Sequence, residues 1–446
     1  MMRIVRGVMR ALRPRNLLAM IGLLVLVHFI VNQALLFKVG RLEEEEGRND
    51  TLAIRSHPDS SDNAAALYRY AYWLNGQIGG ELEKTHPEIE CPGASYYSCA
   101  LDGRPCGKKD SPQLSTEQLE LYGNVLSAKQ PVYDLIARAA TMPACMFTNS
   151  VSPEFWRDME IDGNIELREM ARLVEDKARW DARHGNLAGA WEMGRQGMVL
   201  VKHGEENSSI LCRLNQLSLL QMVASAMVDI ADQGPVPESV AGEYFAPLRS
   251  VSNSRAALVS AQRELAFNVQ GIDIGVAAVP WGYWIQPVAN WEKLRAFRAY
   301  GRLKEALSLG KPTERMAAVQ QLVDTCPPAA ALPPVLCPWR PTPPGPFNLA
   351  WFTYDLPGLF LLHQRMLETG IALKQYKQRQ GSYPQELGLL AKDLPADTTI
   401  DPVTGKPFEY RLEGAGFVLK SPGPKAVGGD NRSGLNQPDI LWQAKN

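Results

Sequence analysis

Most of this chain has the hydrophobic periodicity of amphipathic helices. Between residues 60 and 325, apolar side chains recur at steps of three and four, with polar side chains between them. Nearer the C terminus, over 408–419, the period changes to alternation, which is typical of strands. The pattern therefore predicts a mainly α protein that ends in a small α+β module.

Several helices are predicted in the middle region. The first follows a capping segment, Ser60 to Asn63, and its apolar stripe consists of Ala66, Tyr70, Trp73 and Leu74. Further helices are predicted over 118–140, over 167–182, from 187 onward and over 211–232. Because 211–232 is apolar on most sides, we expect it to form the central, buried helix.

A short polar break at His184, Gly185 and Asn186 separates two of these helices. A helix, a glycine turn and a second helix with small residues at the crossing resemble a tetratricopeptide hairpin, and Gly185 to Ala190 carry the likeness. An array of such repeats needs a further copy at a period of about 34 residues. The sequence contains no second good copy, so it predicts an irregular helical solenoid or bundle over 55–325.

The N terminus has the composition of a membrane anchor. Residues 1–16 form a basic tail that contains several arginines. A mainly apolar stretch follows at 17–37 and has about the length that a helix needs to cross a bilayer. Glu43 to Glu46 follow, which favours a cytoplasmic N terminus and a periplasmic bulk at a bacterial inner membrane. A cleaved secretory signal is the alternative, but the apolar region is long and lacks a small-x-small cleavage site.

Composition limits the remaining choices. The 446 residues are 45% apolar and carry a net charge of −1, so several sizeable cores fit and no basic field favours nucleic acid. Prolines concentrate in 326–347, which predicts a linker between the helical domain, 55–325, and a C-terminal module, 348–446.

The seven cysteines are expected in an oxidising compartment. No Cys-x-x-Cys pair occurs, so disulfides are favoured over a zinc site. Cys212 lies in an apolar helical pattern and is predicted to be a buried free thiol. The disulfide candidates are Cys91, Cys99, Cys106, Cys145, Cys326 and Cys337.

Residues 271–291 allow two interpretations. Their length suits a second membrane span, but Asp273 and two prolines make a span expensive. We therefore expect a loop that lies on the helical domain, with an aromatic cluster at Pro280 to Trp284. The alternative is an exposed Trp/Tyr patch that touches the membrane interface or a partner.

The C-terminal module has a clear order of elements. A long helix is predicted from Asp355 to a stop at Gly381, and a short apolar element follows Pro384. The segment Asp401 to Pro407 then forms a turn, and 408–419 form a hairpin that packs on the long helix. A Gly/Asp-rich tail follows and closes at Asp439 and Ile440.

This order resembles the globular end of the major pseudopilin of type II secretion systems over residues 365 to 440. The resemblance implies a loop that holds calcium, with Asp430 and Asp439 at positions where the family has acidic ligands. Calcium takes about six to eight oxygen ligands, and Lys425 stands where the family usually has another acid. A metal-free loop is therefore favoured over a weak calcium site.

The N terminus departs from this family. Residues 1–40 contain no acidic residue, whereas pseudopilins carry a glutamate near the start of the mature helix. The module is therefore expected to be borrowed. The whole arrangement also resembles bacterial envelope proteins that join an Asn-Ala-Ala helix, here Asn63 to Ala66, to a helical middle and this tail.

The sequence contains no established catalytic motif. It lacks a Gly-x-Ser-x-Gly elbow, a P-loop and a dinucleotide fingerprint, and His184 and His203 adjoin glycines at helix ends, where capping is expected. We expect a non-enzymatic scaffold, without cofactor, that binds other envelope proteins. The alternative is a periplasmic enzyme whose groove carries Glu166 or Glu169 near the aromatic segment at Trp281.

Overall fold

The structure of the protein is a computed structural model. It describes residues 14–48, 62–85, 116–147, 156–205, 210–249, 261, 265, 282–325, 356–421 and 440–443. The described part is mainly helical, with a short antiparallel sheet near the C terminus, as the sequence predicts. The chain divides into two compact units, which are taken in turn.

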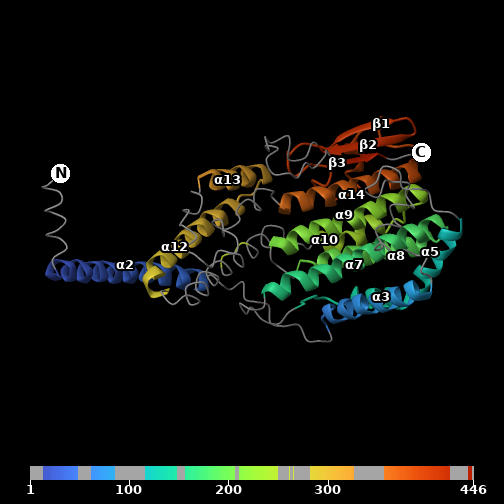
Figure 1. Cartoon of the computed structure of the whole chain (residues 1–446). Coiled ribbons are helices and arrows are strands. Elements are labelled where there is room, and N and C mark those ends of the chain that lie inside the picture. Colours follow the sequence, from blue (N-terminus) through green and yellow to red (C-terminus); the bar gives the residue numbers. More distant parts are fainter. Residues whose placement is uncertain are drawn as a thin grey trace, which may run out of the picture. The chain divides into compact units, whose positions relative to one another are not determined.

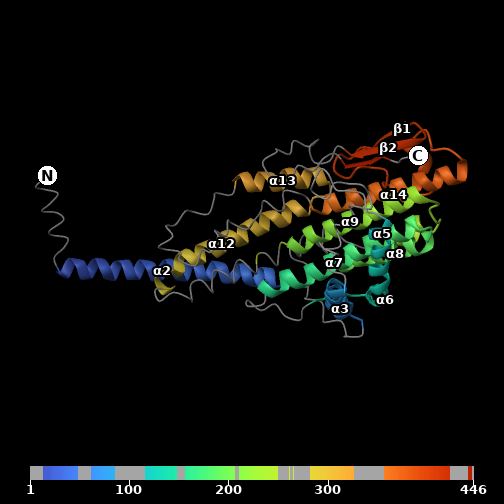
Figure 2. The ribbon, with the colours of Figure 1, turned by 45° about the vertical axis from the view of Figure 1, so that its right-hand side comes forward.

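The first unit combines Met1–Arg55, Ala261–Ala306 and Val319–Ala350. Helix α2, Pro14–Arg48, runs through the predicted anchor, and its window Gly22–Leu42 is long and apolar enough to cross a membrane. Membrane anchors and signal sequences near the N terminus both have this length and composition. Helix α12, Gly282–Leu307, belongs to the same unit, and both views place its beginning beside α2 (Figures 1 and 2).

Helix α12 corrects one expectation. The loop expected over 271–291 is wrong for residues 282–291, which are helical from Gly282 onward. Pro287 lies inside this helix, where its missing N–H and its ring oppose helix formation, and Asn290, three residues on, is fully buried. Residues 271–281 lie outside the described residues. Helix α13, Pro312–Thr325, is shared between the two units.

The second unit combines Ser56–Ser260, Leu307–Ala318 and Trp351–Asn446. Its N-terminal half is a set of packed helices: α3 Ala65–Thr85, α5 Thr116–Ala128, α6 Gln130–Ala139, α7 Trp156–Arg183, α8 Leu187–His203, α9 Ile210–Gln233, the π-helix η1 Val240–Tyr244 and α10 Ala246–Arg249. The single helix expected over 118–140 is wrong in detail. It divides at Lys129 because Pro131, which has no N–H, stands in the first turn of α6.

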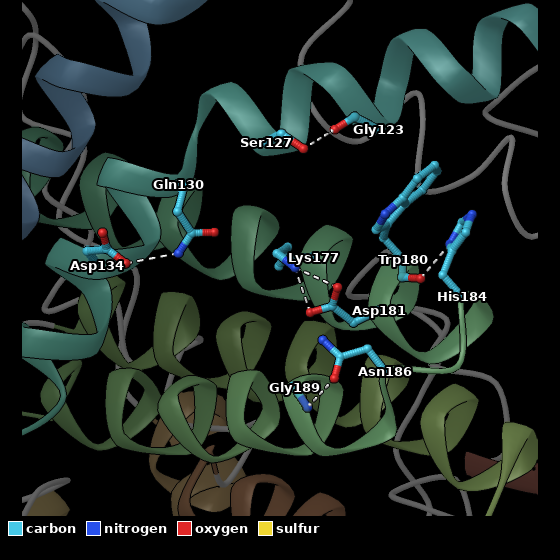
Figure 3. Close-up of polar contacts among 10 residues, drawn as sticks. All are labelled: Gly123, Ser127, Gln130, Asp134, Lys177, Trp180, Asp181, His184, Asn186 and Gly189. Carbon is cyan, nitrogen blue, oxygen red and sulfur yellow. Dashed lines mark hydrogen bonds and ion pairs between the residues drawn. The ribbon is translucent and has the colours of Figure 1, made fainter.

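The break between α7 and α8 is confirmed (Figure 3). Gly185 adopts a φ of 81°, a conformation that costs glycine little. The Asn186 side chain then accepts a hydrogen bond from the Gly189 N–H at 3.1 Å and caps α8. His184 caps α7 as expected, because its Nδ1 lies 2.8 Å from the Trp180 carbonyl oxygen and its ring stacks on the Trp180 indole.

Helix α9 is the central helix of this unit, as expected. It packs against α7, α8 and the C-terminal helix α14, Leu356–Gln380. Gly197 of α8 permits close approach, because a Cβ there would lie 2.9 Å from the side chain of Val223 on α9. The window Arg213–Gln233 is also apolar enough to span a membrane by length and composition, and half of it is buried by these packing contacts.

The C-terminal elements follow the predicted order. Helix α14 is followed by Gly381 at a φ of 78°, and the short element is the 3-10 helix η3, Leu387–Leu390. Strands β1, Glu409–Glu413, and β2, Gly416–Ser421, form the expected hairpin. A third strand that the sequence pattern missed, β3, Ile440–Gln443, pairs with β2 on its other edge.

Helix α14 lies between the sheet and α9 (Figure 1). Polar contacts fix it there: Arg249 of α10 pairs with Glu368 at 3.2 Å, and Lys374 pairs with Asp232 at the end of α9. Burial raises the pKa of Glu368, and the Arg249 guanidinium opposes that rise. The module that the sequence places behind a linker therefore packs directly on the helical core, within the same compact unit.

Candidate interaction surface on α3

The position of α3 is set by Asn63, the last residue of the predicted capping segment. Its Oδ1 accepts hydrogen bonds from the N–H of Ala65 at 3.1 Å and from the N–H of Met146 at 2.8 Å, while its Nδ2 donates to the Met146 carbonyl at 2.9 Å. One side chain therefore caps the helix and ties it to the segment that follows α6. This is the physical role of the Asn-Ala-Ala sequence.

The buried face of α3 differs from the expected one. Ala64, Ala65, Tyr68 and Ala71 are buried, and α3 packs on α6 and α7. The stripe predicted from Ala66, Tyr70, Trp73 and Leu74 is wrong: Ala66, Tyr70 and Trp73 are exposed, and Leu74 is intermediate. The small side chains at 64, 65 and 71 let α3 pack closely on α6 and α7. This face of the helix is therefore buried, and the predicted stripe is not.

The displaced aromatic residues form a defined surface feature. The rings of Tyr70 and Trp73 stack at 5.6 Å between centroids with 15° between their planes. Tyr70 is 52% exposed and Trp73 is 54% exposed, and Tyr72 adds a further exposed ring. Large exposed aromatic rings on one helix are typical of the residues that contribute most to protein–protein interfaces. We call Tyr70 and Trp73 the α3 aromatic pair.

Arg69 lies next to this pair and is held by the core beneath it. Its Nη2 donates to the Phe147 carbonyl at 2.7 Å, and its guanidinium lies 5.5 Å from the centroid of the Phe147 ring. Its Nε lies 3.9 Å from Oε1 of the buried Glu166 on α7. These contacts hold the half-exposed Arg69, which directly precedes Tyr70 in the sequence, in a defined position.

A buried histidine supports the other side of α3. His203, at the end of α8, contacts the Tyr68 hydroxyl through Nδ1 and the Met142 carbonyl oxygen through Nε2, each at 3.0 Å. The capping role expected for His203 is therefore wrong, because its two partners draw the ring into the core. Burial lowers the pKa of His203 to about 4.

The strongest charge cluster of the described residues connects α7 to α9. Arg179 is almost wholly buried and binds Glu175 at 2.8 Å, Asp229 at 2.7 Å and the Ser225 hydroxyl at 2.8 Å. Close by, burial and the carboxylate of Asp176 raise the pKa values of Tyr122 and Tyr133 well above the ordinary value. An arginine paired with acids on two helices acts here to fix helix packing.

The acids that the sequence offered for catalysis do not face each other across a groove. Glu166 and Glu169 lie one turn apart on α7. Glu166 is buried near Arg69, and Glu169 pairs with Arg172 on its own helix. Trp281 lies outside the described residues, so its place relative to these acids stays a prediction.

The structure describes only some of the residues predicted to bind calcium or to form disulfides. Asp430, Asp439 and Lys425 lie outside the described residues, and the described ranges contain no cluster of metal-ligating side chains. Cys145 is fully buried beside the bridge between Asn63 and Ala144, and Cys212 lies in α9. The other five candidates also lie outside the described residues: Cys91, Cys99, Cys106, Cys326 and Cys337.

Comparison with known proteins adds no family. No protein-family model matches this chain, and no curated protein or solved structure is significantly similar to it.

Proposed function

We propose that this protein is a membrane-anchored component of the bacterial envelope that works by binding another envelope protein, without a reaction of its own. Helix α2 supports the anchor, since its apolar residues between Leu23 and Phe37 are mostly exposed. Its apolar stretch also has about the length that a bilayer requires. Arginines before it and glutamates after it favour a cytoplasmic N terminus and a periplasmic second unit.

The single observation that carries the binding function is the α3 aromatic pair. Burial of two stacked aromatic rings away from water would be energetically favourable. In α3, however, Ala64, Tyr68 and Ala71 are buried and the aromatic pair is exposed. Arg69, the residue before Tyr70, is a half-exposed cation on the same helix. Aromatic rings and arginine are the residue types that are enriched at the centres of protein interfaces.

The resemblance of 348–446 to a pseudopilin supports a partner from secretion or pilus-like machinery. Deletion of the module is the direct way to test this idea. Helix α14 packs on α9, however, so removal of the module would uncover an apolar helix face and disturb the fold. Point substitutions on the exposed surface give a cleaner experiment.

The experiment is crosslinking in intact cells, followed by purification of the tagged full-length chain and mass spectrometry of its partners. The double variant Tyr70→Ser, Trp73→Ser should lose a partner that the unchanged protein retains. Leu389→Ser is the matched control, because Leu389 is 47% exposed and lies on η3, away from α3 in the sequence. An identical partner set for all three proteins would contradict the proposal, provided that their melting temperatures agree.

A further inference from the structure

A chain of side-chain amides lies against the apolar helix α2. Asn32 is only 6% exposed, although the apolar residues around it are mostly exposed. Its Oδ1 accepts a hydrogen bond of 2.7 Å from Nδ2 of Asn290 on α12, within the first compact unit. Oδ1 of Asn290 accepts in turn from Nε2 of Gln286 at 3.2 Å. Amide hydrogen bonds of this kind are used to associate helices inside bilayers.

The outer surface of α12 at this level is apolar and aromatic. No charged residue occurs between Gly282 and Trp291, and the first one is Glu292. Ala289 and Asn290 are buried, whereas Val288 is 39% exposed and Trp291 is 48% exposed. An uncharged start that contains Pro287 is compatible with lipid, where proline in a helix is tolerated.

The hydrogen bond also fixes the depth of Trp291 along α2. Asn290 is level with Asn32, and one further residue of helix is about 1.5 Å, so Trp291 lies close to the same level. The first charged residue after the apolar part of α2 is Lys38, roughly 9 Å beyond Asn32 by the same rise per residue. Trp291 therefore lies on the membrane side of Lys38, at the depth where tryptophan belts occur.

We propose that the first turns of α12 enter the bilayer boundary beside α2, with Val288 and Trp291 against lipid and the Asn32–Asn290 hydrogen bond holding the two helices together. The inference rests on the proposed membrane anchor and extends it from one helix to a helix pair. Lipid is the occupant that the surface favours, because α2 and α12 both expose apolar side chains near the level of the Asn32–Asn290 hydrogen bond. The charged residues of α12 begin with the next residue, Glu292, and Lys293 after it is buried.

Photo-crosslinking to lipid tests this. A benzophenone amino acid replaces Leu24, Trp291 or Arg302, one at a time, in the full chain reconstituted in phosphatidylethanolamine and phosphatidylglycerol vesicles. Leu24 is an exposed residue of the anchor, and Arg302 is an exposed residue further along α12. After irradiation, mass spectrometry should find phospholipid adducts at positions 24 and 291 and no adduct at position 302.

The outcomes separate this inference from the proposed function. An adduct at 24 without one at 291 would overturn the helix pair and leave the anchor in place, whereas no adduct at 24 would overturn the anchor itself. The role of the hydrogen bond is tested with the label at 291. Asn32→Leu should lose the adduct, and Gln33→Leu, a neighbouring exposed amide, should keep it. Equal adducts in both variants would refute the holding role of Asn32.

Discussion

The hydroxyl of Tyr68 on α3 lies 3.0 Å from Nδ1 of His203 on α8, although 135 residues separate them in the sequence. A carbonyl oxygen only accepts hydrogen bonds, so Nε2 of His203 carries the proton that it donates to Met142. Nδ1 is then free to accept from the Tyr68 hydroxyl. The neutral ring therefore satisfies both partners, and a second proton would remove the acceptor that Tyr68 uses.

The burial of His203 predicts a loss of stability in mild acid. Its pKa falls from 6.5 to about 4 on folding, so between these values the unfolded chain binds a proton that the folded chain does not. The contribution is complete above the unfolded pKa and is lost as the pH falls towards 4. Urea unfolding of the full chain in detergent should show a decrease in the free energy of unfolding between pH 7 and pH 4, to which His203 contributes on the order of 3 kcal/mol.

The variant His203→Gln should flatten this pH dependence. His363 needs a control, because burial lowers its pKa to about 4 as well. The free energy of unfolding of His363→Gln should therefore still fall with decreasing pH by the contribution of His203. If His203→Gln and the unchanged protein lose stability in parallel between pH 7 and pH 5, the account of this histidine is incorrect.

The contact between α14 and β3 predicts a sharp effect of a single methyl group. A Cβ on Gly370 would lie 1.8 Å from Cζ3 of Trp442, whose ring is buried against the helix. Gly370→Ala should lower the free energy of unfolding by about 1–3 kcal/mol, because the indole must move. Gly79→Ala on α3 is the control, since no atom lies within 4 Å of its Cβ, and it should be neutral or stabilising. Equal melting temperatures for both variants would contradict the packing.

The buried Arg179 predicts a large difference between two arginine substitutions. Arg179→Met removes the buried guanidinium that binds both Glu175 and Asp229, which should cost about 3–5 kcal/mol of stability. Arg195→Met breaks a more exposed pair with Glu192 on one helix and should change stability by less than about 1 kcal/mol. Chemical denaturation of both variants checks this, and a similar small effect for each would refute the role of Arg179.

Asp401 predicts that the motif Asp401 to Pro407 is a structural turn. Its Oδ1 accepts from the Val403 N–H at 2.7 Å, and its Oδ2 accepts from the Ser421 hydroxyl at 2.8 Å. Asp401→Ala should cost about 1–3 kcal/mol because these buried donors lose their acceptor. Asp401→Asn keeps one acceptor oxygen and should therefore lose less stability than Asp401→Ala. Thermal unfolding would argue against this role if the alanine variant melted with the unchanged protein.

Local signals were sufficient for many elements. The turn between α7 and α8 could be predicted because Gly185 and Asn186 carry conformational and capping preferences of their own. The stop of α14 at Gly381 has the same basis. These features depend on a few neighbouring residues, so a single sequence contains the information.

Features decided by distant partners were missed. Two overlapping faces of α3 carry apolar residues at helical spacing. Packing on α6 and α7 buries the face with Tyr68 and leaves Tyr70 exposed. His203 adjoins a glycine, which indicated a cap, but Tyr68 and Met142 determine its place. Strand β3 is only 4 residues long and depends on its pairing with β2. One feature of the sequence could have predicted that the aromatic pair is exposed: the small residues on the same helix suit the packed face better than the large rings do.

The central claim, anchoring through α2, is tested most directly by the intact mass of the protein recovered from carbonate-washed membranes. An uncleaved anchor predicts a membrane-bound chain that still contains Gly22–Leu42, with a mass near 49.4 kDa for the 446 residues. A shorter chain that begins after this segment and is released into the soluble fraction would contradict the account.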